Sequence, residues 1–366
     1  MQDRGQKSQA LQYSIAKRWF PQLELVVYPK IGTANKDKPL TDIDVLSLVP
    51  DEFEAFRTVL IDCKTRKNES PIARALWLRG LMDQLDAARG ISILKKKNIE
   101  DDHRYAASKL GIILLAESEF DEYQKSTSRV ELPFISNASN IDFWDDYLSI
   151  NKRFPSLTNA CDFVFSGFWM CQSSSESCRK TISILKEIKG ELNPDTQHHM
   201  FLVGDLCALF MISISKITSA VFTAYLKPDD RDKLSSALLL QLYGGREAYD
   251  YRNKIWNLVQ KQTNNDAKSE ISGNSFPSLA PPEWDNFIEF IRNCLETPIE
   301  TAKAPLLLRE LAFSRLAQGN DFAEVLARES PHAARLAMAG IEYLCKAAQL
   351  PPEFGENYIN MLMQVQ

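Results

Sequence analysis

The chain has 366 residues, of which 45% are hydrophobic and 25% charged, and its formal net charge is −5. This balance is typical of a folded globular protein and excludes a disordered or collagen-like chain, and the length allows two domains. The charge is uneven, because residues 1–110 hold 19 Lys and Arg against 15 Asp and Glu while the remainder is acidic. We therefore expect any contact with phosphate groups to lie in the N-terminal part.

Hydrophobic runs separated by turn residues predict the elements of the N-terminal part. A helical pattern over residues 10–20 ends before Pro21, and further helical patterns cover residues 71–88 and 101–110, followed by Gly90 and Gly111. Strands are predicted over residues 23–28, 42–49, 58–64, 91–95 and 112–116. Such an alternation predicts an α/β fold built on a mixed sheet.

After about residue 120 the strand signal fades and helical patterns continue to the C-terminus. We therefore expect an α/β domain over residues 1–125 and a large all-α region over residues 139–366. The stretch 263–282 is rich in Asn, Ser, Gly and Pro, which predicts a linker. The acidic helical region is expected to bind a second copy of the chain or a partner protein.

Cysteine usage and hydropathy favour a cytoplasmic protein. The seven cysteines include no CxxC pair, and the N-terminus lacks the apolar core of a signal peptide. The most apolar segment, residues 200–225, contains Asp205 and Lys216, which are costly at bilayer depth. We expect this segment to form a buried helix and the protein to make no membrane contact.

Acidic residues interrupt two of the predicted strands. Alternate residues of a strand share a face, so Asp42 and Asp44 project together from one strand, and Asp62 and Lys64 from the next. Burying an unpaired charge costs on the order of several kcal/mol of folding free energy. Such residues therefore need a partner, a metal ion or a water-filled cleft.

This arrangement resembles the core of PD-(D/E)XK (restriction-endonuclease-like) nucleases. The shared order is helix, strand, strand with an acid, strand ending in acid-x-lysine, helix and strand, and it is similar to that of Mrr-like and Holliday-junction-resolvase-like nucleases. In TDIDVLSL and LIDCK, Asp44 and Asp62 correspond to the two acids and Lys64 to the lysine. The sequence departs from the pattern in that no proline precedes Asp44 and the first helix offers Gln9 and Gln12 where some members carry an acid.

The resemblance implies metal-dependent cleavage of DNA phosphodiester bonds. Asp44, Asp62 and the backbone carbonyl of Cys63 would hold Mg²⁺ or Mn²⁺, and Lys64 would orient the attacking water. Whether a second metal ion binds is left open. Basic residues that follow the third and fourth strands would contact DNA, namely Arg66, Lys67, Lys95, Lys96 and Lys97. By analogy with two-domain nucleases, the expected role is bacterial defence against foreign DNA.

Two other interpretations remain open. Asp62 and Lys64 would form a surface ion pair if the acid-x-lysine pattern arose by chance, and Asp42 and Asp44 would then cap a turn. The domain would in that case be a nuclease-like module that binds nucleic acid without cutting it, or a structural subunit of a larger complex. Alternatively, the chain is chiefly a helical adaptor.

Overall fold

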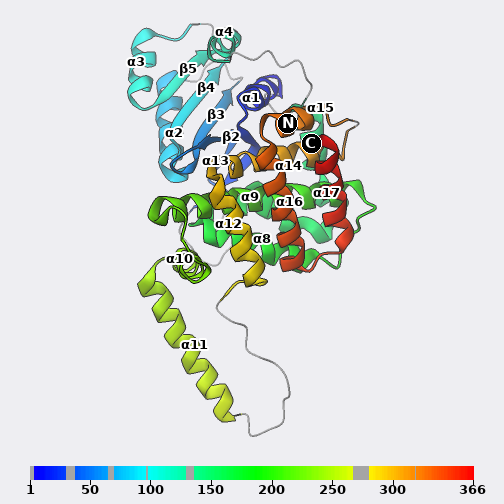
Figure 1. Cartoon of the computed structure of the whole chain (residues 1–366). Coiled ribbons are helices and arrows are strands. Elements are labelled where there is room, and N and C mark those ends of the chain that lie inside the picture. The colour runs from blue at the N-terminus through cyan, green and yellow to red at the C-terminus, as the bar shows by residue number, and fades with distance from the viewer. Residues whose placement is uncertain are drawn as a thin grey trace.

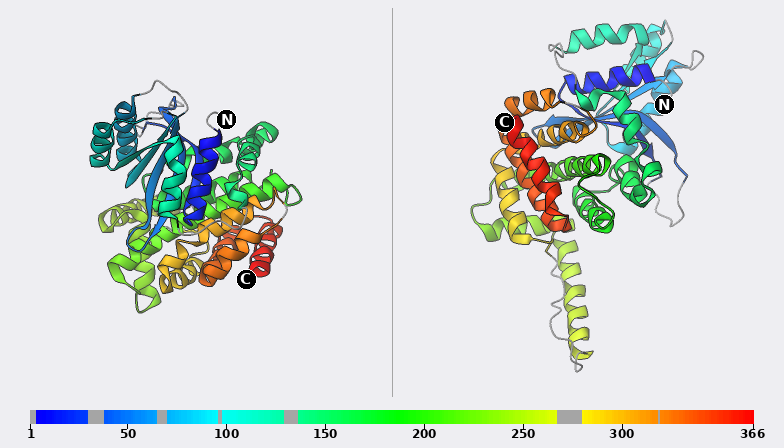
Figure 2. Two further views of the ribbon diagram at one scale, coloured as in Figure 1. Left: turned by 90° about the horizontal axis from the view of Figure 1, so that it is seen from above. Right: turned by 90° about the vertical axis from the view of Figure 1, so that its right-hand side faces the viewer.

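A computed structural model of the chain describes residues 4–29, 38–64, 70–95, 98–128, 136–266, 280–317 and 319–366. Within these ranges a five-stranded sheet with its helices forms the N-terminal part, and helices make up the rest. Figure 1 shows the α/β part stacked against the helical region, and Figure 2 shows the same arrangement from two further sides. The expected mixed sheet followed by a helical region is confirmed.

The elements of the α/β part follow the expected order. They are α1 (Arg4–Ala16), β1 (Phe20–Val27), β2 (Thr41–Asp51), β3 (Ala55–Lys64), α2 (Pro71–Leu85), β4 (Arg89–Leu94), α3 (Asp101–Lys109), β5 (Ile112–Ala116) and α4 (Glu117–Thr127). The sheet order is β1-β2-β3-β4-β5, with antiparallel pairing from β1 to β3 and parallel pairing from β3 to β5. Parallel neighbours need crossover connections, which contain α2 and α3.

The first helix ends earlier than predicted. It stops at Ala16, and Phe20, expected as its last residue, begins β1. Arg18 takes a left-handed conformation with a φ of 60°, which turns the chain. Pro21 then favours extended backbone at Phe20, so the proline acts at the start of the strand and not at the end of the helix.

The first crossover helix, α2, also ends early, at Leu85 instead of residue 88. Asp86 takes the left-handed cap conformation, with a φ of 53°, and its backbone N–H bonds the carbonyl of Met82. Gly90, expected to close the helix, lies in β4 instead. A Cβ there would come within 2.9 Å of the Leu78 side chain, so the close packing of α2 on the sheet requires glycine.

The helical region is built around one long apolar helix, α9. Its elements are η1 (Asn137–Ser139), α5 (Ile141–Tyr147), α6 (Ile150–Arg153), η2 (Pro155–Leu157), α7 (Thr158–Asp162), η3 (Phe163–Gly167), α8 (Ser174–Ile188), α9 (Gln197–Tyr225), α10 (Arg231–Tyr243), α11 (Arg246–Asp266), α12 (Trp284–Glu296), α13 (Pro298–Thr301), α14 (Ala304–Phe313), α15 (Asp321–Glu329), α16 (Pro331–Ala348) and α17 (Pro352–Val365). By length and composition α9 is apolar enough to cross a membrane, but 94% of its most apolar window is buried. The expected buried helix is confirmed, and α9 is the core of this region.

Helix α14 joins the sheet to the helical core through Arg309, whose side chain is fully buried. Its guanidinium pairs with Asp205 of α9, with Nε 2.6 Å from Oδ1, and donates to the Pro21 carbonyl and the Gln22 side chain of β1. The two regions consequently share one continuous hydrophobic core. The expected boundary near residue 125 falls in the last turns of α4.

Helix α11 projects away from the body of the molecule (Figure 1 and right-hand view of Figure 2). It reaches Asp266, so the predicted linker over residues 263–282 begins in its last turn. Most of that stretch lies outside the described residues.

Candidate metal centre

The pairing of strands β2 and β3 stops before the start of β2 and the end of β3. Among the described residues, their pairing ends at Val45 and Ile61. The outer pairings continue further, to Thr41 on the β1 side and to Lys64 on the β4 side. The two strands therefore form a fork, and Asp44 and Asp62 are the next residues on either side of its mouth. Continuing the register from Val45 and Ile61 places them opposite each other.

The carboxylate of Asp44 occupies the opening of the fork. Its Oδ2 accepts a hydrogen bond from the backbone N–H of Cys63 at 2.6 Å, where a regular ladder would use a backbone carbonyl. Its Oδ1 lies 2.9 Å from the Nζ of Lys7. The side chain is only 3% exposed, so these contacts fix the orientation of the carboxylate.

Lys7 reaches this site from α1 as a buried cation. Its side chain is 4% exposed, and its Nζ lies 2.5 Å from Oε1 of Glu24 as well as beside Asp44. Burial by itself lowers the pKa of Lys7, but the charges and hydrogen bonds of the two acids outweigh it and raise that pKa above its ordinary value. The ammonium group is therefore charged at neutral pH.

Glu24 lies in β1 between Leu23 and Leu25, which pair with Val45 and Ile43, so it falls opposite Asp44. Its φ of 52° is in the left-handed region, which costs about 1 kcal/mol or more for a residue with a side chain. Carboxylate oxygens of Glu24, Asp42 and Asp44 lie within 4.8 Å of one another. Like charges on opposed strand positions repel, and the ammonium of Lys7 offsets that repulsion.

Asp62 is held from a different helix. Arg74 of α2 donates from Nε to Oδ2 at 2.7 Å and from Nη2 to Oδ1 at 2.5 Å, a two-pronged ion pair. The hydroxyl of Ser92 on β4 also donates to Oδ2, at 3.1 Å. The Arg74 guanidinium lies 3.4 Å from the ring centroid of Trp77. Asp62 is 1% exposed, so the alternative of a surface ion pair on an edge strand is wrong for this residue.

The other predicted site residues fall as follows. The backbone of Lys64 ends β3 opposite Leu94, and its side chain lies outside the described part. The N–H and C=O of one strand residue point the same way, so the Cys63 carbonyl faces the fork as its N–H does. Lys95 is exposed just after β4. The remaining predicted DNA contacts also lie outside the described residues, namely Arg66, Lys67, Lys96 and Lys97.

The donor set suits a hard divalent cation. Mg²⁺ and Mn²⁺ prefer oxygen ligands, which carboxylates and a backbone carbonyl supply here. Each carboxylate has about four lone-pair sites, so Asp44 can accept from Cys63 and still bind a cation. Asp62 can join as a ligand once Arg74 has released it.

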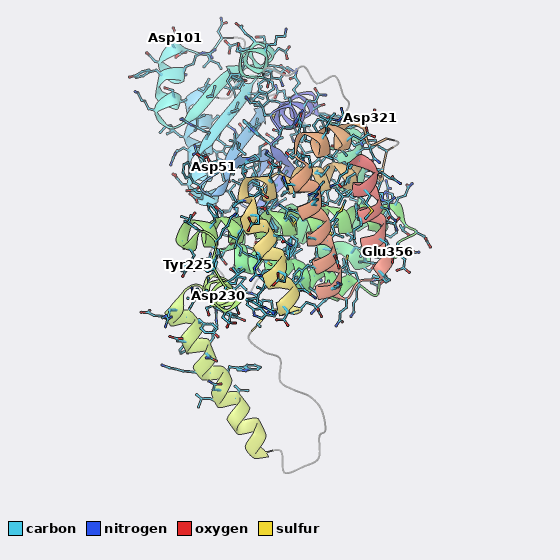
Figure 3. All side chains as sticks on the ribbon, in the orientation of Figure 1. Asp51, Asp101, Tyr225, Asp230, Asp321 and Glu356 are labelled. Atoms are coloured by element: carbon cyan, nitrogen blue, oxygen red, sulfur yellow. The ribbon has the colours of Figure 1, made fainter. Side chains whose placement is uncertain are left out.

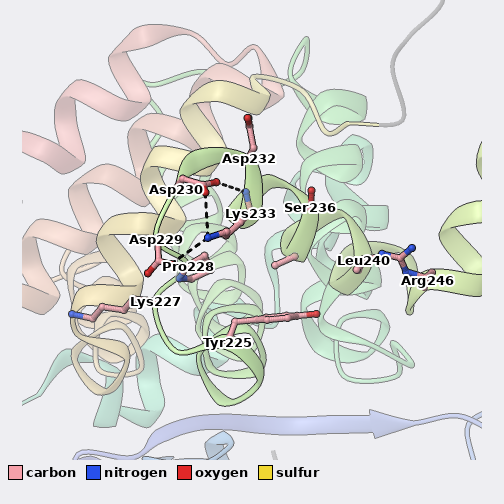
Figure 4. Close-up of a pocket in the computed structure, with 11 residues that line it drawn as sticks. Tyr225, Lys227, Pro228, Asp229, Asp230, Asp232, Lys233, Ser236, Leu240 and Arg246 are labelled. Carbon is pink, nitrogen blue, oxygen red and sulfur yellow. Dashed lines mark hydrogen bonds and ion pairs between the residues drawn. The ribbon is translucent and has the colours of Figure 1, made fainter.

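The described pockets lie away from these acids. Two pockets of about 650 and 660 Å³ surround α10, and one of about 310 Å³ lies between the turn after α1 and the helices α14 to α16. In the first of them Lys233 pairs with Asp229, with Nζ 3.2 Å from Oδ2, and Asp230 caps α10 (Figure 4). Asp230 and Tyr225 lie far from the Asp101 end of the α/β part (Figure 3). These charges are locally paired, and nothing links them to the fork.

The chain matches no family model, and no curated protein or solved structure matches it significantly.

Sequence reasoning missed Lys7, Glu24 and Arg74. One signal was available for Lys7, because it lies one helical turn before Leu11 and two before Ser14 on the face that packs on the sheet. A lysine on such a buried face requires an acid nearby. Arg74 lies near the start of a helix that follows the acid-x-lysine motif, but no spacing rule marks it as a partner of Asp62.

Proposed function

We propose that the chain is a metal-dependent nuclease of the PD-(D/E)XK type that hydrolyses DNA phosphodiester bonds. The observation that carries this proposal is the burial of Asp44 and Asp62 on opposite sides of the strand fork, with Asp62 two residues before the lysine of the motif. Burying two acids at a strand end is costly unless cations balance their charges.

Each residue has a role in this proposal. Asp44, Asp62 and the Cys63 carbonyl hold Mg²⁺ or Mn²⁺, and Lys64 orients the water and balances charge. The metal, when bound, polarises the phosphate and lowers the pKa of a bound water. The Cys63 N–H fixes the Asp44 carboxylate before any ligand arrives, so little reorganisation is needed.

Arg74 has to exchange partners for Asp62 to bind metal. A guanidinium recognises phosphate with the same two-pronged geometry that it uses for carboxylate. We infer that Arg74 moves from Asp62 to a substrate phosphate, while Trp77 supports the face of its guanidinium. Substrate and metal would then favour the same arrangement, in which Arg74 has left Asp62.

The proposed partners follow from the uneven charge of the two parts of the chain. The basic N-terminal part, with Lys95 and its neighbours, is proposed to contact DNA, whereas the acidic helical region is suited to a second copy or a partner protein. A cytoplasmic role in bacterial defence against foreign DNA is consistent with this division and is part of the proposal.

One observation favours the competing function, a nuclease-like module that does not cut. Lys7 and Arg74 already neutralise both acids, as they would in a purely structural site. The two functions differ in a simple measurement, because only a nuclease needs a divalent ion to act on its nucleic acid.

The test is incubation of the purified full-length chain with supercoiled plasmid in Mn²⁺, Mg²⁺ or a chelator. Nicking is expected with metal and not with chelator, and Asp62→Ala or Lys64→Ala should abolish it. Asp83→Ala is the matched control, since Asp83 pairs with Arg79 on the exposed face of α2. A folded protein that binds DNA yet never cleaves it with any divalent ion would be the non-catalytic module.

A further inference from the structure

We propose that the ammonium group of Lys7 serves as a built-in second cation of the metal centre, so that the site takes one divalent ion and not two. This inference rests on the proposed nuclease function and decides a point that the motif leaves open.

The position of Lys7 carries the argument. In sites with two metal ions, the ions lie about 3.5 to 4 Å apart and act on both sides of the reacting phosphate. Asp44 stands where a shared ligand would stand: its Oδ2 faces Cys63 at the mouth of the fork, and its Oδ1 faces Nζ of Lys7 at 2.9 Å. The second cation position beside Asp44 is therefore filled by the protein itself.

The acids around Lys7 form the coordination group that a metal ion would use. Oxygens of Glu24, Asp42 and Asp44 lie within 4.8 Å of one another, and Nζ contacts two of these residues. A single positive charge among three carboxylates leaves the group acidic. Removing it would leave a nearly complete oxygen site for a divalent ion.

Helix α1 keeps the ammonium in place. Further along the same face, the Ser14 hydroxyl bonds that of Ser47 on β2 at 2.8 Å. At its outer end Arg4 pairs with Asp142 and with Asp145 of α5, the latter at 2.9 Å. A divalent ion could displace Lys7 only by taking the acids that pair with this buried lysine, and a buried charge without its partner is costly.

Glu24 is then a positioning residue for Lys7 and not a metal ligand. Its left-handed backbone brings the carboxylate within 2.5 Å of Nζ, on the side opposite the fork. Its loss should disturb the lysine and leave the catalytic ion bound.

The experiment is a Mn²⁺ titration of the full-length protein, in which electron paramagnetic resonance counts the free ion. We expect one bound Mn²⁺ per chain for the wild type and two for Lys7→Met. Lys17→Met is the matched control, because Lys17 directly follows the same helix but contacts the Thr127 carbonyl, and it should keep one. Glu24→Gln should also keep one, with an affinity changed by less than about tenfold, the lower end of outer-shell effects.

Two bound ions in the wild type, or a single ion of unchanged affinity in a folded Lys7→Met, would overturn the inference. If circular dichroism shows that Lys7→Met does not fold, the Glu24→Gln variant tests the inference instead. Loss of the bound ion in Glu24→Gln would show that Glu24 is a metal ligand and would contradict the inference. Plasmid nicking by the same wild-type preparation distinguishes failure of the Lys7 inference from failure of the proposed nuclease function. Nicking with two bound ions refutes only the role of Lys7, whereas no nicking and no bound ion refutes the nuclease as well.

Discussion

Asp44 and Asp62 lie opposite each other just beyond the last paired residues of β2 and β3, yet cations from different helices hold them. Lys7 reaches Asp44 from α1, and Arg74 reaches Asp62 from α2. The two contacts differ in kind. Lys7 is 4% exposed and paired with two acids, whereas Arg74 is 11% exposed and stacked on a half-buried tryptophan. Of the two cations, Arg74 is the more accessible one, and the proposed exchange of partners falls on it.

Arg74→Gln should tighten Mn²⁺ binding by about tenfold or more, because it removes the cation that competes for Asp62. In the absence of metal the same change should lower the free energy of unfolding by about 3 kcal/mol, as the buried carboxylate of Asp62 loses its two-pronged ion pair. Calorimetric titration and urea denaturation with and without Mn²⁺ measure both effects. Arg79→Gln, on the exposed side of α2, is the control, and weaker Mn²⁺ binding by Arg74→Gln would contradict an exchangeable Arg74.

Lys95→Gln should weaken DNA binding through one lost phosphate contact. The dependence of log K on log salt should become shallower by about 0.9, the value for one released counterion. Fluorescence anisotropy with a short duplex at several salt concentrations measures the slope. Lys109→Gln changes an exposed lysine at the far end of α3 and serves for comparison. Equal slopes for wild type and Lys95→Gln would remove Lys95 from the DNA contact surface.

Arg309→Met should destabilise the whole protein by about 3 to 5 kcal/mol, since Asp205 would remain buried without its partner. The double variant Arg309→Met with Asp205→Leu should recover most of this loss, because it removes both buried charges. Urea denaturation followed by tryptophan fluorescence gives the three free energies. A loss below about 1 kcal/mol, the range of exposed pairs, would show that the network contributes little to joining sheet and helices.

Glu310 should make stability depend on pH. Burial raises the pKa of its carboxyl from 4.5 to about 6, although hydrogen bonds from Ser136 and from the N–H groups of Ala138 and Asn137 oppose the shift. Because the folded pKa is the higher one, the contribution of this group is fully present below pH 4.5 and is lost as pH rises to about 6. The loss amounts to about 2 kcal/mol for a shift of this size.

Glu310→Gln removes this titration. The unfolding free energy of the wild type minus that of the variant should therefore fall as pH rises from 4.5 to above 6. Urea denaturation at four or five pH values measures this difference. A constant difference over that range would mean that Glu310 keeps an ordinary pKa.

The strands and their order were predictable from the sequence, because they follow from local patterns. The apolar run from Ile112 to Ala116 gave β5 with both ends correct. Period-two alternation placed Asp44 on β2 and Asp62 with Lys64 on β3, and both acids do lie at the mouth of the fork. Helix ends were less predictable where Arg18 and Asp86 turned the chain in left-handed conformations.

The partners of the two acids were decided only by the tertiary structure. Lys7 and Asp44 are brought together by the packing of α1 on the sheet, and Arg74 meets Asp62 because the crossover helix returns over β3 and β4. Glu24 carries no mark of its backbone conformation in the sequence around it. Periodicity reports which face of an element a residue occupies, but it contains no information on which other element will cover that face. The charge balance of the site depends on which element covers that face, and packing between residues distant in the chain determines this.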